Sequence, residues 1–536
     1  MPKVQEIFEL LSRYEAVSAI GKGTYGFVCS ARDSEKVEFL STAEDGDLPE
    51  ELREDALAEC DPDERADLLD AFTMVAIKKL KGLFEDYNNP RMWMCAIREI
   101  QLMMKFNHEN VMCASDFFIP LGGLESMTFN SIRYLKQNFE SVYIVMKKMD
   151  YTLREVLDSM EVTRKDIPEE VYQRLFAEEG KPELEDDEVL RDRETHLLLH
   201  PLTVDYRKFI LYQIMRGLGY MHRCCVMHRD MKPENVLMDR SYKTCITDFG
   251  QGRDVSVELF MQRNKSEDVD DIMSLTQSVD NLYKAKAKIP PNDANQSYNA
   301  AYVDSIVNSA QTLLDNTSQW YAPPETLSVV VQLSSSVGYI DGASFHGIDV
   351  WSVGCIAAEM LLGRPLFATS KMGGAGQIIK IIELLGEPSE KDQADLVAHR
   401  GEESRELFVK VLQKVLVQNN LQGKTNTLRD ILHSPYGDET EEEVQLIMDC
   451  LAWNPAARIT IEKALQSPYF ANDGYDPEVD PNETVQHVTS VRLADIEDPV
   501  TGREMLWELY AQRHPEVQEL WHSLSAKHTP DGDSKE

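Results

Sequence analysis

The sequence is short of positive charge. It holds 55 lysines and arginines against 92 aspartates and glutamates, which gives a formal net charge of −37 over 536 residues. A surface with this balance repels nucleic acid and anionic membranes, so we expect neither as a partner. The shortage is greatest between Lys288 and Arg364, where no basic residue occurs. Basic partners or substrates suit such a chain, although much of the negative charge can equally serve solvation.

Long apolar runs and metal-type cysteine patterns are also missing. No run of about 18 apolar residues occurs, so no membrane-spanning helix is expected. The nine cysteines are scattered, and the adjacent pair Cys224–Cys225 does not have the spacing of a metal site. We interpret them as reduced thiols, as is typical of the cytoplasm or the nucleus. The start of the sequence, MPKVQEIFELLSRY, has the spacing of an amphipathic helix and not the features of a signal peptide.

The order of strand and helix patterns predicts an α+β chain in two parts. Apolar residues make up 43% of the sequence, which is enough for a large core, and the length suggests two lobes or one catalytic unit with insertions. Strand patterns occupy residues 16–30, 73–80 and 141–149, and residues 95–106 have helical spacing. Helical patterns dominate from about residue 150. The first part should therefore be β-rich and the second mainly helical.

Three acidic or polar insertions interrupt this order, at about residues 33–72, 161–195 and 255–310. The first carries 16 aspartates and glutamates against three basic residues. Within it, Asp61 has the residue type of an N-cap and Pro62 that of a first helical position, so a short helix is expected there. The insertions can serve as solvated spacers, docking surfaces or autoinhibitory covers. A further helix is expected near residues 500–524.

A glycine-rich turn, Gly21-x-Gly23-x-x-Gly26-x-Val28, separates the first two predicted strands. Glycines there would let backbone N–H groups approach a phosphate without Cβ clashes. The turn is not a P-loop, because no Gly-Lys-Ser/Thr follows, and it is not a Rossmann fingerprint, because a strand follows it instead of a helix. Taken alone, it is better interpreted as a structural turn.

Two charged residues further on extend the pattern. Lys78 ends the strand residues Val75-Ala76-Ile77, and Glu99 lies in the next predicted helix. A carboxylate at that position could pair with Lys78 and hold its ammonium towards phosphate oxygens. Neither residue is informative alone, because a lone strand lysine usually faces solvent.

The most informative run is His228-Arg229-Asp230-Met231-Lys232-Pro233-Glu234-Asn235, followed by Asp248-Phe249-Gly250. Phosphoryl transfer needs a carboxylate near the attacking hydroxyl, a cation on the transferred phosphate and oxygen ligands for Mg²⁺. Asp230 would orient the hydroxyl and accept its proton, and Lys232 would neutralise the phosphate. Asn235 and Asp248 would bind the metal. Chance does not explain the whole ordered set, so the alternative is an inactive member of the same fold.

With these motifs, the sequence resembles the eukaryotic protein kinases over roughly residues 14–470. Within them it is similar to the mitogen-activated protein kinases and their cyclin-dependent relatives. The stretches that carry the resemblance include GKGTYGFVCSARD, REIQLMMKFNHENV, VYIVMKKM, HRDMKPENVL, DVWSVGCIAAEML and WNPAARITIEKALQSPYF. The resemblance implies a bilobal α+β kinase fold, with an N-lobe at about 14–147 and a C-lobe at about 150–470. The remainder, 471–536, is a C-terminal extension, and its stretch YDPEVDP (475–481) resembles the segment that runs back along the small lobe in mitogen-activated protein kinases.

The resemblance also implies where ATP would bind. The expected ATP-binding residues are Ile20, Gly21, Lys22, Gly23, Gly26, Val28, Ala76, Lys78, Met146, Lys147, Met149 and Leu237. Four of their apolar side chains would sandwich the adenine, with Met146 as gatekeeper and Lys147–Met149 as the hinge. Ordinary core packing is the other interpretation of these apolar residues. Asp349 would brace the catalytic loop, and Glu325 would form a buried ion pair with Arg458.

The segment from Asp248 to Glu325 corresponds to the activation segment and departs from the family pattern. The Thr-x-Tyr pair that is phosphorylated in the resembling kinases is absent, and the two arginines that receive the phosphotyrosine are replaced by Gln319 and Ala322. Pro323 replaces the usual alanine, so a preference for Ser/Thr-Pro substrates stays open. The arginines that clamp the phosphothreonine are retained as Arg98, Arg229 and Arg253. Either acidic side chains of the insertions satisfy them, or a phosphorylated residue from 256–318 does, with Thr312 and Thr317 as candidates.

These observations predict a protein serine/threonine kinase that uses ATP and Mg²⁺, with catalytic residues Asp230, Lys232, Lys78 and Glu99. Expected partners are protein substrates and an upstream kinase in a signalling cascade. The rival interpretation is a pseudokinase or scaffold that binds partners through its acidic insertions. A third possibility is a kinase that is active only towards one docked partner.

Overall fold

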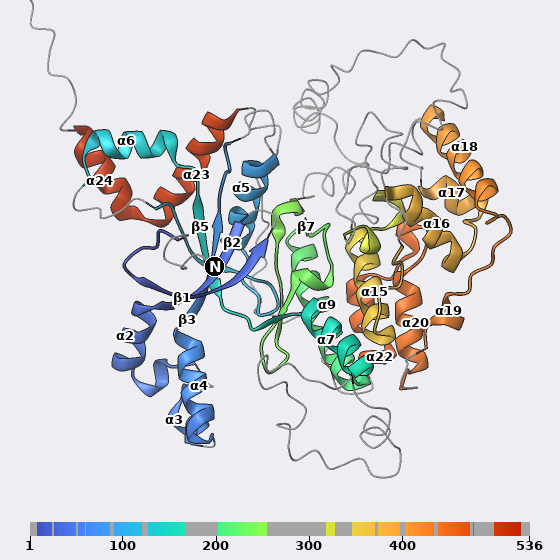
Figure 1. Ribbon diagram of the computed structural model, residues 1–536, viewed down its shortest axis with the longest axis horizontal. Helices are drawn as coiled ribbons and strands as arrows, with labels where there is room; N and C mark the ends of the chain where they lie inside the picture. Colours follow the sequence, from blue (N-terminus) through green and yellow to red (C-terminus); the bar gives the residue numbers. More distant parts are fainter. Residues whose placement is uncertain are drawn as a thin grey trace, which may run out of the picture. The chain divides into compact units, whose positions relative to one another are not determined.

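The computed structural model describes most of the chain outside the two longest insertions (Figure 1). The described residues are 8–23, 26–49, 52–58, 60–85, 91–120, 127–166, 202–254, 318–326, 346–369, 373–396, 402–433, 438–471, 475 and 498–526. The predictions for about 161–195 and 255–310, and those for Thr312 and Thr317, therefore fall largely outside the described residues.

The chain divides into two compact units. Unit 1 comprises Met1–Asn107, Met112–Met149 and Ser490–Glu536, and unit 2 comprises His108–Val111 and Asp150–Thr489. Unit 1 thus combines the first part of the sequence with its last residues.

Unit 1 is built on a five-stranded antiparallel sheet of order β1-β2-β3-β5-β4. The strands are β1 (Tyr14–Gly23), β2 (Gly26–Asp33), β3 (Met74–Leu80), β4 (Ala114–Phe118) and β5 (Val142–Lys147). The central strands supply the core, since Val75, Ile77, Ile144 and Val145 are at most 1% exposed. The strands predicted at 16–30, 73–80 and 141–149 are confirmed, as is the predicted helix at 95–106, which is α5 (Arg91–Met103).

The first insertion folds into short helices between β2 and β3. They are α2 (Ser34–Thr42), the 3-10 turn η1 (Asp45–Asp47), α3 (Glu54–Ala58) and α4 (Pro62–Thr73). The predicted helix start at Pro62 is confirmed. Helices α2 and α4 are joined by Lys36, whose Nζ donates to the Phe72 carbonyl at 3.1 Å, and by the Phe39 and Phe72 rings, whose centroids are 6.2 Å apart.

The two ends of the chain differ from their predicted helices. Residues 8–13 are not helical, because Phe8 is buried and the Glu9 N–H donates to the Tyr143 hydroxyl at 3.1 Å instead of to a helix carbonyl. The helix expected near 500–524 is two helices, α23 (Pro499–Arg513) and α24 (Pro515–Ala526). The break falls at Pro515, which has no N–H to continue the first helix. Within unit 1 these helices lie beside α5, β4 and α6 (Phe129–Asn138) (Figure 1).

Unit 2 is mainly helical, as expected from the sequence. Its helices are α7 (Leu153–Asp166), α9 (Val204–Arg223), α15 (Gly347–Leu362), α16 (Gly373–Leu385), α17 (Glu390–Leu396), α18 (Glu402–Gln418), α19 (Leu428–Ile431), α20 (Glu441–Cys450), α21 (Ile461–Leu465) and α22 (Pro468–Ala471). Every residue of α15 is buried, and this helix contacts α9 and α20. It forms the centre of the unit 2 core.

Short strands in unit 2 place the loops between them. One sheet has the order β6 (Tyr151–Thr152), β8 (Val236–Met238) and β9 (Thr244–Ile246), and β7 (Val226–Met227) pairs with β10 (Arg253–Asp254). The loop after β7 and the loop after β9 carry the predicted catalytic residues. Across the ranges described, no helix is long and apolar enough to cross a membrane.

Candidate active site

One face of the unit 1 sheet gathers four of the predicted ATP-binding residues. Ala76 on β3 lies directly opposite Met146 on β5, and Val28 on β2 lies opposite Lys78 on β3. Cross-strand partners share a face, and Ala76 and Lys78 share one because they are two residues apart. Val28, Ala76, Lys78 and Met146 therefore form one continuous surface.

Lys78 and Glu99 form the ion pair that the sequence predicts. Lys78 Nζ donates to Glu99 Oε1 at 2.5 Å, and the two side chains are 17% and 3% exposed. Glu99 is held there by α5, whose residues Trp93, Ile97 and Ile100 are buried in the unit 1 core. A carboxylate as buried as Glu99 requires a compensating cation. The pair therefore fixes the Lys78 ammonium on the sheet face described above.

The glycine-rich turn is the hairpin between β1 and β2, in which Gly23 pairs with Gly26. A Cβ at Gly26 would lie 1.7 Å from the Lys79 carbonyl oxygen, so only glycine fits against β3 there. A Cβ at Gly21 would make only ordinary contacts with Val28. Lys22 pairs with Phe27, and Ile20 on β1 is 45% exposed. The close approach of β2 to β3 thus gives Gly26 a packing role.

The predicted hinge residues follow the end of β5. Met146 is 6% exposed and Met149 is 8% exposed, whereas Lys147, the last residue of β5, is exposed. The remaining predicted adenine contact, Leu237, lies in unit 2 on β8, opposite Thr152 and Cys245, and is half-buried. Their roles in binding ATP remain predictions.

The catalytic loop of unit 2 brings three predicted residues together. Lys232 Nζ donates to Asp230 Oδ2 at 2.9 Å. Asn235 Nδ2 donates to the Asp230 carbonyl at 2.7 Å and lies 3.3 Å from Asp230 Oδ2. Lys232 and Asn235 thus both contact Oδ2 of the Asp230 carboxylate and orient it. Burial alone would lower the pKa of Lys232, but Asp230, with Asp248 and Glu234, raises it, so the ammonium is retained at neutral pH.

Asp349, near the start of α15, holds the backbone of this loop. Its Oδ2 accepts the His228 N–H at 2.8 Å, and its Oδ1 accepts the Arg229 N–H at 2.7 Å. His222 Nε2 lies 3.0 Å from Oδ2. Burial opposes its charge, yet these hydrogen bonds keep the pKa of Asp349 below its ordinary value. Arg229 has a φ of 68°, which is strained for a residue with a side chain, so the loop needs this support. The predicted brace is confirmed.

The second loop is tied to the first. His228 Nε2 lies 2.9 Å from the Thr247 carbonyl, and the Thr247 N–H donates to the Asn235 carbonyl at 3.0 Å. Asp248 has a left-handed backbone conformation, with φ of 66°. Phe249 is fully buried, and its ring contacts the His228 ring. The chain therefore presents Asp248 next to the catalytic loop.

Asn235 and Asp248 suit a magnesium ion. Because the Asn235 amide nitrogen donates to Asp230, its amide oxygen is the atom left for a metal. Amide and carboxylate oxygens are ligands that Mg²⁺ accepts, usually with waters and substrate phosphates completing the shell. In the described part of the chain, no group of three or more His, Cys, Asp or Glu side chains could hold a metal by itself.

One cluster in unit 2 was not found by the sequence. Tyr321 donates its hydroxyl to Glu359 Oε2 at 2.5 Å, and Arg154 from α7 donates to Glu359 Oε1. Burial raises the pKa of Glu359 to about 7. Ser352 also donates to the Tyr321 carbonyl at 2.8 Å. Tyr321 thus anchors this part of the chain to α15, and no motif in the sequence pointed to its partners.

The predicted ion pair at the end of that segment is confirmed. Arg458 binds both oxygens of Glu325, at 2.6 and 2.8 Å, and also donates to the Gly347 carbonyl at 2.7 Å. Both charged side chains are buried. Residues 318–326 are therefore fixed to α15 at two points, through Tyr321 and through Glu325.

The three arginines predicted to clamp a phosphate lie in both units. Arg98 is on α5 in unit 1 and is 9% exposed. Arg229 is in the catalytic loop of unit 2, and the backbone of Arg253 pairs with Met227 just before that loop. A shared phosphate ligand remains a prediction.

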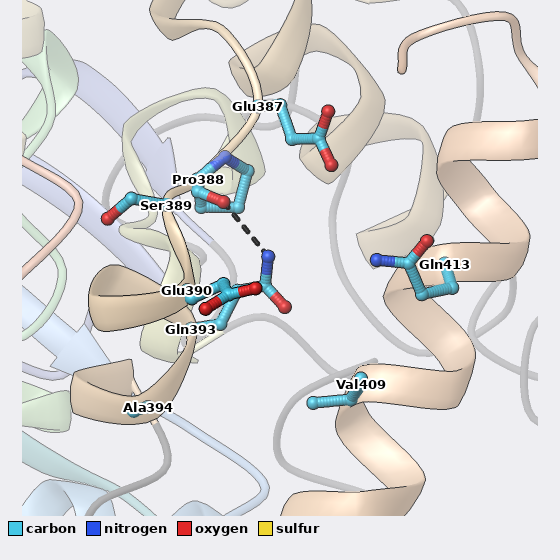
Figure 2. Close-up of a pocket in the computed structure, with 8 residues that line it drawn as sticks. All are labelled: Glu387, Pro388, Ser389, Glu390, Gln393, Ala394, Val409 and Gln413. Carbon is cyan, nitrogen blue, oxygen red and sulfur yellow. Dashed lines mark hydrogen bonds between the residues drawn. The ribbon is translucent and has the colours of Figure 1, made fainter. Parts of the chain in front are cut away.

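A separate pocket of about 670 Å³ lies in unit 2, between the residues around α17 and helix α18 (Figure 2). Glu387, Glu390 and Gln413 line it, and Gln393 Nε2 donates to the Pro388 carbonyl at 2.9 Å across one wall. None of the predicted site residues lines this pocket. It is therefore distinct from the catalytic loop.

Comparisons with known proteins agree with this geometry. A family model of the protein kinase domain matches residues 184–267 and 304–470. Extracellular signal-regulated kinase 1 of Dictyostelium discoideum is 25% identical over 474 residues, which cover 88% of this chain but only 58% of that relative. Mitogen-activated protein kinase 5 of Arabidopsis thaliana is 26% identical over 506 residues, covering 94% and 87%. Mitogen-activated protein kinase spk1 of Schizosaccharomyces pombe is 24% identical over 464 residues, covering 87% and 80%.

The bilobal α+β fold, the catalytic loop of unit 2 and these matches lead to the same family. They support a eukaryotic protein kinase that resembles the mitogen-activated protein kinases.

Proposed function

We propose that the protein is an active serine/threonine kinase that transfers the γ-phosphate of ATP to protein substrates. The observation that carries this proposal is the catalytic loop, where Lys232 and Asn235 orient the Asp230 carboxylate and Asp349 holds the backbone. The Asp230 side chain is 21% exposed, so it is accessible to a substrate hydroxyl while these contacts hold it in place.

Each residue has a role that follows from its chemistry. Asp230 orients the substrate hydroxyl and accepts its proton, and Lys232 stabilises the charge on the transferred phosphate. Lys78, fixed by Glu99, does the same for the other phosphates of ATP. Mg²⁺, held by Asn235 and Asp248, would neutralise phosphate charge in the bound nucleotide. Val28, Ala76 and Met146 provide an apolar face for the adenine.

The substrate class rests on Lys232 and on the family resemblance. A lysine at this position is typical of kinases that act on serine and threonine, and the negative chain favours basic protein substrates. The resemblance also favours an upstream activating kinase, a signalling role and a place in the cytoplasm or nucleus. Arg98, Arg229 and Arg253 would bind a phosphorylated serine or threonine from residues 256–318, and phosphosite mapping of the active enzyme tests this.

The proposal is tested by incubating the protein with Mg²⁺, ATP labelled in the γ-phosphate and a generic basic protein. We expect label on serine or threonine of the substrate, and loss of labelling when EDTA removes the metal. No incorporation into any protein would favour the scaffold interpretation, in which the acidic insertions bind partners. Autophosphorylation without substrate labelling would instead indicate a kinase that needs a docked partner.

A further inference from the structure

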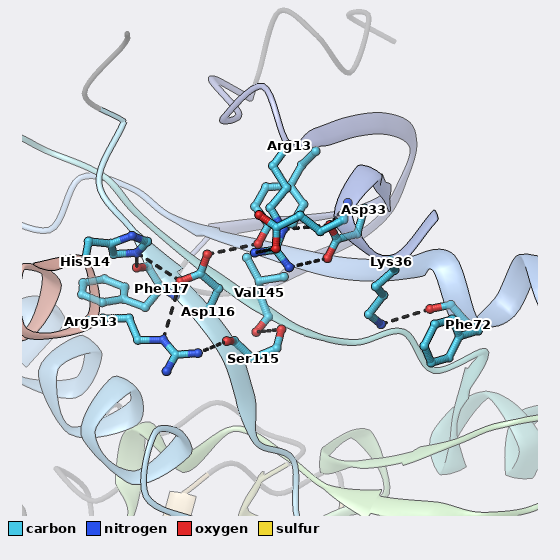
Figure 3. Close-up of polar contacts among 12 residues, drawn as sticks. Arg13, Asp33, Lys36, Phe72, Ser115, Asp116, Phe117, Val145, Arg513 and His514 are labelled. Atoms are coloured by element: carbon cyan, nitrogen blue, oxygen red, sulfur yellow. Dashed lines mark hydrogen bonds and ion pairs between the residues drawn. The ribbon is translucent and has the colours of Figure 1, made fainter. Parts of the chain in front are cut away.

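A buried carboxylate in the unit 1 sheet is bound by the last part of the chain (Figure 3). Asp116 on β4 is 6% exposed. Its Oδ1 lies 3.1 Å from His514 Nε2 and 3.9 Å from Arg513 Nε, and its Oδ2 accepts the Tyr14 hydroxyl at 3.1 Å. Arg513 also donates to the Ser115 carbonyl at 2.6 Å. Residues almost 400 positions apart therefore share one polar cluster inside a single unit.

Both nitrogens of the His514 ring face oxygen acceptors. Nε2 lies 2.9 Å from the Phe117 carbonyl as well as close to Asp116, and Nδ1 lies 3.1 Å from Glu516 Oε1 on α24. A neutral imidazole carries one N–H and would leave its other nitrogen facing an acceptor, whereas an imidazolium donates from both. The side chain is only 15% exposed, so little water replaces these partners. This geometry selects the protonated form of His514.

The cluster lies at the end of α23, which packs on the helix that carries Glu99. A Cβ at Gly502 would lie 2.9 Å from the Trp93 ring of α5, so the two helices approach as closely as a glycine allows. Arg503 stacks 4.2 Å over the Phe84 ring and donates to the Phe139 carbonyl at 3.3 Å. Trp93 is itself 1% exposed. Undocking of α23 would therefore expose one side of α5.

We propose that Asp116, His514 and Arg513 form a proton-dependent latch that docks α23 and α24 on unit 1, and that docked α23 positions Glu99 through α5. The effect on catalysis rests on the proposed kinase function, whereas docking does not. Asp116, His514 and Arg513 are positioning residues, since none of them belongs to the catalytic loop or the ATP-binding face.

The direction of the pH dependence follows from the groups around His514. Burial alone would lower its pKa, but Asp116 and the Phe117 carbonyl, with Glu516, raise it above the ordinary value. Stabilisation from such a group is complete below its unfolded pKa and is lost as the pH rises through the folded one. Burial holds the pKa of Tyr14 and of Tyr510 well above their ordinary values, so both hydroxyls stay protonated. The latch should weaken above neutral pH because His514 alone changes charge.

The latch is tested by hydrogen exchange of the full chain, followed by mass spectrometry, between about pH 6 and about pH 8.5, with rates corrected for the intrinsic effect of pH. In the wild type, protection of α23 should fall with rising pH. His514→Gln should lower protection about tenfold at the acid end and remove its pH dependence, because no imidazolium forms. His514→Lys, which stays charged, should keep α23 protected throughout. His433→Gln is the matched control, since His433 forms an exposed pair with Glu439 in unit 2.

The same variants test the positioning of Glu99. Protection of α5 and the rate of phosphate transfer, each relative to wild type, should change in parallel with protection of α23. At alkaline pH, His514→Lys should therefore retain the α5 protection and the transfer rate that His514→Gln loses. The latch would be overturned if protection of α23 in the wild type did not change with pH. It would also be overturned if α23 in His514→Gln had the same protection as in wild type at every pH. Loss of α23 protection without any change in α5 or in rate would overturn the positioning role. A protein with no transfer activity at any pH contradicts the kinase function, and the exchange data then still decide whether the latch exists.

Discussion

At the scale of single residues, buried charges hold the parts of unit 2 that surround the catalytic loop. Asp349 binds the loop backbone, Glu359 binds Tyr321, and Arg458 binds Glu325. Each makes several hydrogen bonds inside the core, where a charge without its partner is costly. Their hydrogen bonds fix the geometry of the backbone and side chains that they contact.

Arg458→Ala leaves the Glu325 carboxylate buried without its bidentate partner. We expect a loss of about 3 to 5 kcal/mol in the free energy of unfolding, measured by urea denaturation. The matched control is Arg429→Ala, which removes an exposed pair with Glu441 and should cost at most about 1 kcal/mol. Equal effects of the two substitutions would contradict the structural role given to Arg458.

The sequence could predict pairs whose members lie in recognisable motifs. Lys78 with Glu99 and Glu325 with Arg458 were expected, because each residue occupies a motif position that implies its partner. The Tyr321–Glu359–Arg154 cluster was not expected. Arg154 and Glu359 are 205 positions apart, and neither lies in a motif that implies the other as its partner. Asp116 and His514 were missed for the same reason. Such contacts depend on the packing of whole elements, which local spacing does not encode.

At the scale of elements, the approach of β2 to β3 fixes the sheet face that carries Val28, Ala76 and Lys78. Gly26 makes this possible, because its missing side chain lets the Lys79 carbonyl approach. The sequence suggested a phosphate-binding purpose for Gly26, and the register adds a packing reason that only the paired strands could reveal.

Gly26→Ala should push β2 away from β3. The added Cβ would meet a backbone carbonyl that cannot rotate aside, so we expect a loss of about 1 to 3 kcal/mol in unfolding free energy. The displaced Val28 should also raise the KM for ATP. Gly46→Ala, in η1, has open space around it and serves as the control, with little change in either quantity. An unchanged Gly26→Ala protein would contradict the strand register described above.

Element boundaries show where sequence patterns stop being informative. Pro62 marks the start of α4, because proline suits a first helical turn. Pro515 interrupts the helical pattern near residues 500–524 and divides it into α23 and α24. Residues 8–13 have helical spacing but bind the sheet through Phe8 and Glu9, so tertiary contacts override their local preference.

At the scale of the whole molecule, the net charge of −37 should decide which substrates are attracted. With a basic peptide substrate, we expect the rate at low substrate concentration to fall several-fold between about 50 mM and about 300 mM salt, because salt screens long-range attraction. A peptide of the same length with neutral residues in place of the basic ones should show little change. The same salt response for both peptides would mean that the charge only keeps the protein soluble.

The order of lobes and motifs along the chain was predictable, because each motif has a fixed place in the kinase fold. The addition of the last residues to unit 1 was expected only from resemblance, and its contacts with α5 were not foreseen. Gly502 and Trp93 carry no motif, and their complementarity appears only when both helices are in place.

The central claim is that the catalytic loop transfers phosphate, and Asp230→Asn tests it most directly. Asparagine keeps the size of the side chain and cannot accept the hydroxyl proton. With Mg²⁺, ATP and a basic protein substrate, we predict an initial rate about 10² to 10⁴ times lower than wild type. The unfolding temperature should stay unchanged, which shows that the fold is intact. Equal rates of phosphate incorporation by the two proteins would contradict the account.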